Sequence, residues 1–385
     1  MKKIGLYLDS IVTGGTFQYN LSILEAFRSI PTDQIETVIT YSSDLWESYL
    51  QKENISAKRI NRTIFSRLWF QTRAPFWLWR NTAKYFDTFS KSFIQQKCDL
   101  WVFPSQDIWS YGLPISTLGT IHDLMHRYER QFPEAGSQKE YKSREKHYSR
   151  MCREAKGVLV DSTIGKQQLI ESYNIPSLKV HELPFIAPKY IYQNKNSTPL
   201  NYNLPTKYIF YPAQFWEHKN HKSLVRAASQ LIAKLPDLKM VFVGSPNNGY
   251  NSLIELIKKL GLQDVFILLD QVPDDEMRIL YKNARALVMP TFFGPTNIPP
   301  LEAFACGCPV AISNIYGMPD QVGSAGLLFD PNSVVEIADI IYKLWTDDDI
   351  VNNLIKNGFE KNKDWSQTQF NQRLFEIISS IIGKN

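Results

Sequence analysis

The sequence predicts an α/β protein with two doubly wound domains, each built on a parallel sheet. Its 385 residues exceed the roughly 100–200 residues of one ordinary domain. Its 44% hydrophobic and 21% charged residues are typical of a soluble globular protein. Short apolar runs alternate with helical stretches along the chain, and this alternation is interrupted once near the middle. Such alternation is typical of parallel sheets covered by helices.

The first domain is expected at residues 1–187. Short runs rich in β-branched and aromatic residues predict its strands, at 3–8, 36–41, 100–104, 117–121 and 157–161. Many of these runs are apolar on both faces, which indicates that helices cover both sides of the sheet.

Residues 188–205 contain three prolines and four asparagines without hydrophobic periodicity, so they are expected to be a linker. The alternation then restarts and predicts a second domain at 206–364, followed by a C-terminal helix at 365–385 that crosses back to the first domain. Strands are expected at 207–212, 239–244, 265–268, 286–290, 309–313 and 326–329, and helices at 221–235, 250–260 and 275–284. Ligands of open α/β sheets bind beyond the carboxyl ends of the strands, so two facing domains predict a site in a central cleft.

The charge and the termini limit the partners and the location. A net charge of +5 gives no indication of nucleic acid binding. The N-terminal apolar run ends at Asp9, too early for a signal peptide, and no run reaches the roughly 18 apolar residues of a membrane span. We therefore expect a cytoplasmic protein. Its four cysteines are expected to be reduced, and no metal site is expected because the acidic runs at 274–275 and 347–349 are typical of helix starts.

Gly14 and Gly15 lie between the first predicted strand and an apolar helix. Backbone N–H groups at a helix N-terminus, beside residues without a Cβ, can bind phosphate. A tight turn without a ligand is the alternative explanation.

His122 and Asp123 follow the predicted strand at 117–121. At the carboxyl end of a strand, a histidine can bond a sugar hydroxyl or a developing charge. Alternatively, the two residues only cap the strand end and a turn.

Lys219 is expected in the loop just before the helix at 221. There it would add a full positive charge to the helix dipole and could hold a diphosphate leaving group. A solvated surface lysine is the alternative.

The segment from Phe292 to Ser313 is the most informative part of the chain. A loop rich in glycine and proline leaves a strand and enters a short helix that contains Glu302. The loop backbone at 296–298 could reach phosphate and base edges, and Glu302 could accept two hydrogen bonds from a ribose. Because a glutamate in an apolar helix needs a partner, a salt bridge within the domain is the alternative.

In chain order these motifs resemble the retaining glycosyltransferases of family 4, which have the GT-B architecture of two Rossmann-like domains facing a central cleft. The matching segments are 14–15, 122–123, 160–162, 219–220, 299–310 and 364–378. The resemblance implies three catalytic residues: His122 at the transferred sugar, Lys219 at the diphosphate and Glu302 at the ribose. It also implies substrate-binding residues, namely Gly14, Gly15, Asp123, Gln214, Asn220, Gly294, Thr296, Asn297 and Ile298.

The chain departs from the family pattern at two positions. An arginine usual before the lysine is absent from residues 213–215, so neutralisation of the diphosphate falls more heavily on Lys219. A first glutamate usual seven residues before Glu302 is replaced by Gly294, which puts the identity of the sugar in doubt. Phe215 and Trp216 could line that region instead.

The resemblance implies a retaining, metal-independent hexosyltransferase with a nucleotide sugar as co-substrate and no other cofactor. A front-face mechanism is favoured, because no pair of carboxylates suited to double displacement stands out in the sequence. Mannose or a deoxyhexose such as rhamnose is the expected sugar. The expected acceptor is a saccharide, in particular a polyprenyl-diphosphate-linked chain of O-antigen or other surface polysaccharide. A non-catalytic nucleotide or sugar binder and a sugar-nucleotide epimerase of the same fold are the alternatives.

Residues 54–86 contain seven Lys or Arg and no Asp or Glu, interleaved with aromatic residues. The basic and aromatic part at 58–84 suits peripheral contact with an anionic membrane at its inner face. Equally, the rings could belong to the core of the first domain and the charges could be solvated.

Overall fold

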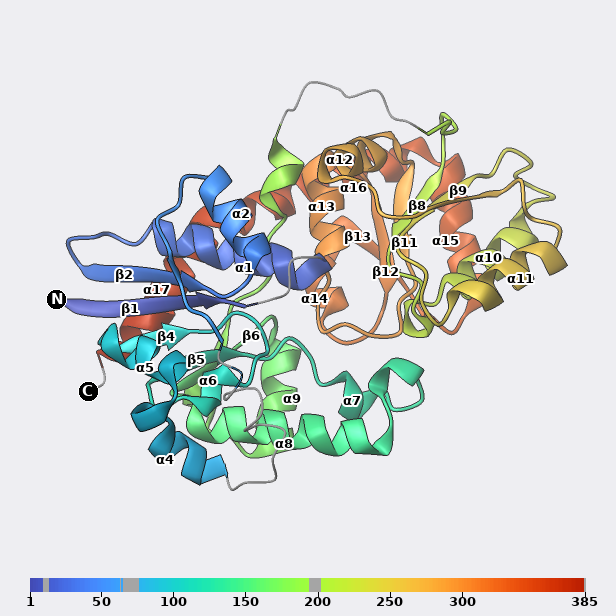
Figure 1. Ribbon diagram of the computed structural model, residues 1–385. Coiled ribbons are helices and arrows are strands. Elements are labelled where there is room, and N and C mark those ends of the chain that lie inside the picture. The colour runs from blue at the N-terminus through green and yellow to red at the C-terminus, as the bar shows by residue number, and fades with distance from the viewer. Residues whose placement is uncertain (10–13, 63, 65–75, 194–201, 384–385) are drawn as a thin grey trace. The chain divides into compact units, whose positions relative to one another are not determined.

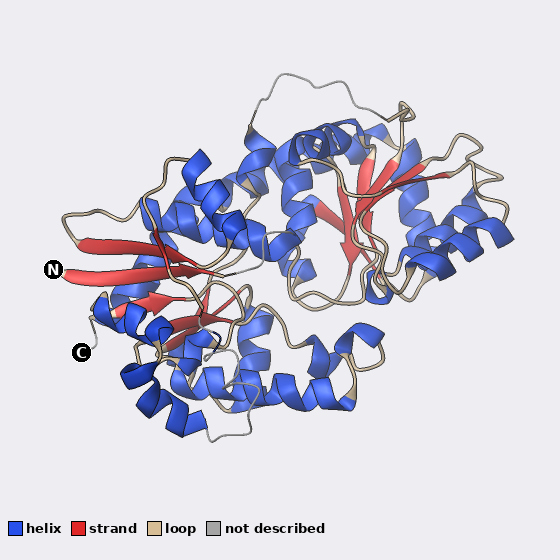
Figure 2. Ribbon diagram, viewed as in Figure 1, coloured by secondary structure: helices blue, strands red, loops and turns tan. Residues whose placement is uncertain are grey.

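The computed structural model describes residues 1–9, 14–62, 64, 76–193 and 202–383. The chain divides into two compact units. Unit 1 comprises Met1–Leu124, Lys142–Pro184 and Gln367–Asn385, and unit 2 comprises Met125–Tyr141 and Phe185–Ser366. In each unit, helices lie against a parallel sheet (Figures 1 and 2).

Two segments differ from the predicted boundaries. Met125–Tyr141 falls inside the predicted first domain but belongs to unit 2, because its side chains pack on loops of that unit. Part of the predicted linker also belongs to unit 2: the short 3₁₀ helix η3 (Lys189–Tyr192) buries Ile191 in that unit's hydrophobic core. The sequence pattern missed both because their few anchoring side chains have no periodic spacing.

Unit 1 has an all-parallel sheet in the order β3-β2-β1-β4-β5-β6-β7. Its strands are β1 (Lys2–Leu8), β2 (Ile35–Tyr41), β3 (Lys58–Arg59), β4 (Leu100–Val102), β5 (Thr117–Thr120), β6 (Gly157–Val160) and β7 (Val180–Glu182). The sequence analysis did not predict β3 and β7, which have two and three residues and carry too short a pattern.

The helices of unit 1 bury aromatic faces against this sheet. They are α1 (Gly14–Arg28), α2 (Asp44–Lys52), α4 (Phe76–Phe86), α5 (Thr88–Gln95), α6 (Trp109–Gly112), α8 (Gln138–Glu154), which begins in unit 2, α9 (Thr163–Tyr173) and α17 (Gln367–Ile382). Phe89 and Phe93 of α5 and Trp101 of β4 are fully buried and pack together. The C-terminal α17 packs on α1, where the Phe370 ring lies 6.1 Å from Tyr19.

Unit 2 has a second parallel sheet in the order β10-β9-β8-β11-β12-β13. Its strands are β8 (Ile209–Pro212), β9 (Met240–Val243), β10 (Phe266–Leu269), β11 (Ala286–Met289), β12 (Val310–Ser313) and β13 (Gly326–Phe329). All six predicted strands of the second domain are therefore present, each within a few residues of its predicted bounds.

The α-helices of unit 2 are α7 (Met125–Tyr128), α10 (His221–Leu231), α11 (Tyr250–Lys259), α12 (Asp274–Asn283), α13 (Ile298–Cys306), α14 (Met318–Val322), α15 (Val334–Thr346) and α16 (Asp348–Asp364). The predicted acidic helix starts are confirmed: α12 begins at Asp274, and Asp347 caps α16 by accepting from the Ile350 N–H at 3.0 Å. Amphipathic α10 buries Leu224, Ala228 and Leu231 and packs against α15.

Both sheets reverse their strand order at one point, between β1 and β4 in unit 1 and between β8 and β11 in unit 2. Loops that follow the strands at such a point form the usual ligand-binding crevice of this architecture. In the described residues, none of the helices combines the length and the apolar character needed to cross a membrane.

Candidate functional site

The loops after β8 and β11 meet at the point where the sheet of unit 2 reverses. Lys219 ends the short 3₁₀ helix η4 (Glu217–Lys219) in the first loop. The N–H of Phe292, in the second loop, donates to the carbonyl of His218 at 2.8 Å, and the Thr291 hydroxyl donates to the same carbonyl at 3.2 Å. The structure therefore brings the two predicted donor-binding loops into direct contact.

Asn220 holds this arrangement together. It has a left-handed backbone conformation (φ 59°), which asparagine tolerates better than most residues. Its Nδ2 donates to the carbonyls of Pro290 and Pro331, each at 2.9 Å, and its Oδ1 accepts from the Ser223 hydroxyl at 2.7 Å. The side chain therefore fastens neighbouring loops to the start of α10, and its substrate-binding role stays a prediction.

The N-terminus of α13 follows the second loop. Gly294 has a φ of +139°, and a Cβ there would lie 2.7 Å from Nδ2 of Asn297. Asn297 precedes the helix without capping it, and its buried Nδ2 has no hydrogen-bond partner in the described part of the chain. The N-terminus of a helix usually offers free backbone N–H donors, but Pro299 and Pro300 have none. The side-chain amide of Asn297 therefore supplies a hydrogen-bond donor at this end of α13.

Glu302 is enclosed within unit 2. One carboxylate oxygen accepts from the Tyr281 hydroxyl at 2.6 Å, and the other accepts from the Tyr190 hydroxyl. Burial raises the pKa of the carboxyl group, although both tyrosine bonds act in the opposite direction. The expectation that Glu302 needs a partner is confirmed, but the partners are tyrosines rather than the cation of a salt bridge. Since both oxygens are engaged, this geometry favours a structural role over the predicted ribose contact.

The remaining predicted residues of unit 2 differ in accessibility. Gln214 is exposed and accepts from the Trp216 indole N–H at 2.8 Å. Thr296 is half-buried, and Ile298 is buried in the first turn of α13. Phe215 is only 1% exposed and packs on His221, so its suggested position beside the sugar is wrong.

Unit 1 brings together the glycine loop and His122. Gly14 begins α1 with a φ of +72°, and Gly14 and Gly15 are both exposed. Tyr19, one turn further along α1, lies with its ring edge-on to His122, the two centroids being 5.1 Å apart. Burial lowers the pKa of His122 to about 4, while Asp123 raises it slightly. The His122 ring is therefore neutral at pH 7 and can act only as a hydrogen-bonding group.

The sequence analysis missed the contribution of Met125–Tyr141 to unit 2. The Phe132 ring stacks on Phe292 with centroids 5.3 Å apart, and the Tyr316 hydroxyl donates to Glu129. Glu134 lies 3.4 Å from Nδ1 of His218. Burial and the charge of Lys219 lower the pKa of His218, so this contact joins a carboxylate to a neutral ring at pH 7. No sequence signal marks these contacts, because each involves a single side chain.

The comparisons with known proteins agree with this arrangement. Residues 193–361, which include both donor loops, match the family described as glycosyl transferases group 1. This part of the chain, less than half of its length, resembles that family. The matched residues include the strand-end loops of unit 2 described above.

Curated relatives of the family have low sequence identity to this chain. The O-antigen chain mannosyltransferase B of Escherichia coli is 28% identical over 219 residues, which cover 55% of this chain and 57% of that protein. A serotype-specific mannosyltransferase of Escherichia coli is 25% identical over 275 residues, covering 68% of this chain and 32% of that protein. The chain thus spans little more than half of the first relative and about a third of the second.

Solved structures match over the whole chain. A glycosyltransferase from Rickettsia africae ESF-5 has a TM-score of 0.75 at 20% identity, covering 100% of this chain and 99% of that one. Anabaena Alr3699/HepE, solved in complex with UDP-glucose, has a TM-score of 0.73 at 17% identity, covering 99% and 100%. These matches show that the protein has the predicted GT-B fold.

Proposed function

We propose that this protein is a retaining glycosyltransferase that moves a hexose from a nucleotide sugar to a saccharide acceptor. The main support is the hydrogen bond between the Lys219 loop and the loop that leads into α13, at the crevice of unit 2. A lysine cation, a free asparagine amide and a helix N-terminus at one sheet edge suit a diphosphate.

In the proposed reaction, an acceptor hydroxyl oxygen bonds to the anomeric carbon of the sugar while the bond from that carbon to the diphosphate oxygen breaks. The acceptor proton passes to the leaving diphosphate on the same face, so the anomeric configuration is retained. The products are a glycoside and a nucleoside diphosphate. Because negative charge grows on the diphosphate, fixed donors are expected to lower the barrier by about 3–4 kcal/mol each. Lys219 and the Gly14–Gly15 amides are the proposed donors.

His122 is proposed to contact the transferred sugar. Its ring is uncharged at neutral pH, and Tyr19 packs against it. A neutral imidazole can orient a sugar hydroxyl without attracting the diphosphate. This separates the sugar contact of unit 1 from the charge stabilisation proposed for Lys219.

The proposed sugar is mannose or a deoxyhexose such as rhamnose. The proposed product is a surface polysaccharide or O-antigen. The support is that two similar proteins of Escherichia coli are named as O-antigen and serotype-specific mannosyltransferases. A lipid-linked acceptor would require the enzyme to work at the inner face of a membrane.

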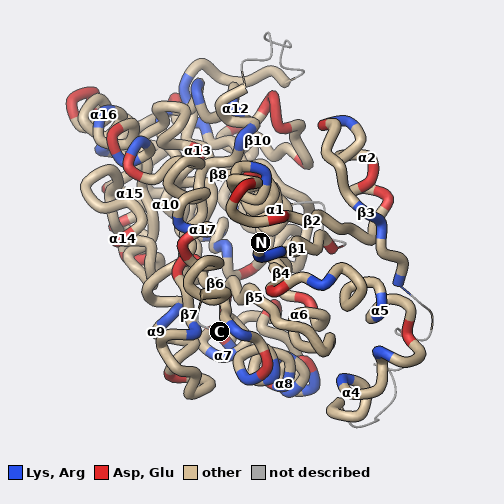
Figure 3. The backbone as a smooth tube through the Cα atoms, turned by 90° about the vertical axis from the view of Figure 1, so that its left-hand side faces the viewer, with Lys and Arg blue, Asp and Glu red and all other residues tan. Residues whose placement is uncertain are grey.

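Peripheral membrane contact is proposed through α4. Trp77 is 64% exposed and Tyr85 70% exposed, and Lys84 lies over the Tyr85 ring. Another aromatic residue of this helix, Trp79, is fully buried, and Arg80 pairs with Glu154 of α8, whose mixed charges are marked in Figure 3. The buried Trp79 fits the alternative in which the rings belong to the core, and the exposed Trp77 and Tyr85 support the membrane proposal. Arg67, Trp69, Phe70 and Arg73 lie outside the described residues. Salt-sensitive binding to anionic vesicles, reduced in Trp77→Ala, is expected; equal binding to neutral vesicles would contradict the proposal.

Turnover with a panel of nucleotide sugars and a saccharide acceptor tests the proposed function. Lys219→Ala should lose about 10²–10³-fold in kcat, whereas Lys234→Ala, which removes an exposed lysine of the same unit, should keep full activity. EDTA is expected to leave the rate unchanged. Binding without turnover would indicate a non-catalytic binder, and conversion of the nucleotide sugar without an acceptor would indicate an epimerase.

A further inference from the structure

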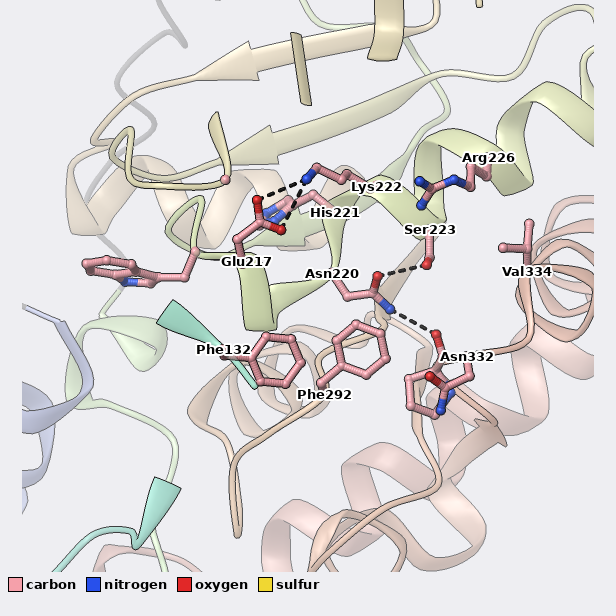
Figure 4. A pocket seen from close by; sticks show the side chains of 13 residues that line it. Phe132, Glu217, Asn220, His221, Lys222, Ser223, Arg226, Phe292, Asn332 and Val334 are labelled. Carbon is pink, nitrogen blue, oxygen red and sulfur yellow. Dashed lines mark hydrogen bonds and ion pairs between the residues drawn. The ribbon is translucent and has the colours of Figure 1, made fainter. Parts of the chain in front are cut away.

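Unit 2 contains a pocket of about 390 Å³ beside the proposed donor loops (Figure 4). Of the predicted site residues, Asn220 lines it, whereas Lys219 and Glu302 do not. The pocket has an aromatic wall, a charged wall and the first turn of α10. The combination of these three parts indicates which kind of ligand would fit.

The aromatic wall consists of Phe132 and Phe292. Their rings are nearly parallel, with an interplanar angle of 26° and centroids 5.3 Å apart, and both side chains are half-buried. Figure 4 shows the two rings side by side, across from the cationic side chains of α10. Such a wall suits the C–H face of a sugar ring.

The charged wall has an excess of positive charge. Nζ of Lys222 pairs with both carboxylate oxygens of Glu217, at 2.9 and 3.1 Å, so these two charges neutralise each other. Arg226 lies one turn further along α10, is exposed, and makes no ion pair within the described residues. The α10 helix also begins without a side-chain cap, which leaves the positive end of its dipole at the pocket. The wall therefore favours one anionic group.

His221 lines the pocket and has a ring nitrogen without a hydrogen-bond partner in the described residues. The side chain is 4% exposed, and one ring nitrogen bonds to the backbone of Ala213. The other nitrogen, Nε2, is buried and has no hydrogen-bond partner in the described part of the chain. In a neutral ring that donates through Nδ1, Nε2 can accept a hydrogen bond from a ligand hydroxyl.

We propose that this pocket binds a sugar unit that carries a carboxylate or a phosphate group. Its ring would stack on Phe132 and Phe292, its anionic group would pair with Arg226, and a hydroxyl would donate to His221. The sugar would be an acidic unit of the acceptor chain. This assignment rests on the proposed function, but binding of an anionic sugar in the pocket does not depend on it.

Isothermal titration with glucuronate, mannose 6-phosphate, mannose and inorganic phosphate tests this proposal on the full chain. At least one anionic sugar should bind about tenfold more tightly than mannose and inorganic phosphate. Arg226→Ala and Phe132→Ala should each weaken that binding about tenfold or more, whereas Lys258→Ala, which removes an exposed lysine elsewhere in unit 2, should not. Preference for glucuronate or for mannose 6-phosphate identifies the anionic group.

The proposal would be overturned if no anionic sugar binds, if inorganic phosphate binds as tightly as the sugars, or if Arg226→Ala and Lys258→Ala have the same effect on binding. A loss of sugar binding in Lys219→Ala equal to that in Arg226→Ala would also overturn it, because the ligand would then occupy the donor loops. Turnover measured in parallel separates the two proposals. Active enzyme without sugar binding disproves only this pocket, and sugar binding without turnover disproves only the transferase function.

Discussion

The Tyr281 hydroxyl donates a 2.6 Å hydrogen bond to the Glu302 carboxylate, inside unit 2. The Tyr190 hydroxyl donates to the second carboxylate oxygen. These bonds join η3, α12 and α13, three elements that are far apart in the sequence. Glu302, which the sequence predicted as a ligand contact, thus links η3 to α12 and α13.

Tyr281→Phe should lower the free energy of unfolding by about 1–3 kcal/mol, because it leaves one oxygen of a buried carboxylate unsatisfied. Thermal melting measures this loss. Tyr250→Phe is the matched control, since Tyr250 is half-buried and its hydroxyl makes no hydrogen bond in the described residues. Equal melting temperatures for the two variants would contradict a stabilising role for the Tyr281 bond.

Glu302→Gln should lower the melting temperature and change the KM for the nucleotide sugar by less than about threefold, because the carboxylate bonds tyrosines rather than a ribose. The amide NH₂ cannot accept the bond that one tyrosine donates, so the packing is disturbed. Donor titration alongside thermal melting separates the two roles. A tenfold rise in KM at an unchanged melting temperature would restore the ribose contact.

His122→Ala should reduce kcat by about 10²-fold while leaving donor affinity nearly unchanged, because the contact is proposed for the transferred sugar. Burial holds the pKa of this histidine at about 4, below its usual value, so the ring stays neutral from pH 6 to 8. The pH profile of kcat should therefore show no step near pH 6.5 that depends on His122. Such a step in the wild type, absent from the variant, would refute a neutral ring.

Asp107→Asn should stabilise the protein above pH 7 and have little effect below pH 4. Burial raises the pKa of Asp107 to about 7, and Oδ2 is buried without a hydrogen-bond partner in the described residues. Because its pKa is higher in the folded state, the protonated carboxyl group contributes stability that is fully present below the unfolded-state pKa near 3.9. This stability is lost as the pH rises through 7. Melting curves from pH 4 to 8 test this, with the exposed Asp33→Asn as control. A rise in the melting temperature of Asp107→Asn that is independent of pH would rule out the Asp107 charge as its cause.

Gly244→Ala should displace the loop that carries Lys219. A Cβ at Gly244 would lie 2.4 Å from the carbonyl oxygen of Ala213, a backbone atom that cannot rotate away. We expect a destabilisation of about 1–3 kcal/mol together with weaker donor binding. Gly261→Ala, where the Cβ would meet no atom within 4 Å, should leave donor binding unchanged. Unchanged donor affinity in Gly244→Ala would show that the loop accommodates the methyl group.

The alternation of apolar runs with helical stretches was sufficient to predict both sheets. Every predicted strand is present, because buried parallel strands need continuous apolar runs and these can be read locally. The strand-end position of His122 also followed from the sequence, since a polar residue directly after such a run must lie at the sheet edge. Lys219 lies, as predicted, in the loop just before α10. The missed β3 and β7 carry too few residues for a pattern.

The sequence by itself determined the two parallel sheets, the strand-end loops and the resemblance to glycosyltransferases, because periodicity and motif order are properties of neighbouring residues. Only the tertiary structure decided which side chains those loops engage. It gave Glu302 two tyrosine partners, made Asn220 a link between loops and placed Met125–Tyr141 in unit 2. Each of these contacts joins residues that are far apart in the chain or single side chains without periodic spacing, and local sequence patterns carry no information about such pairs.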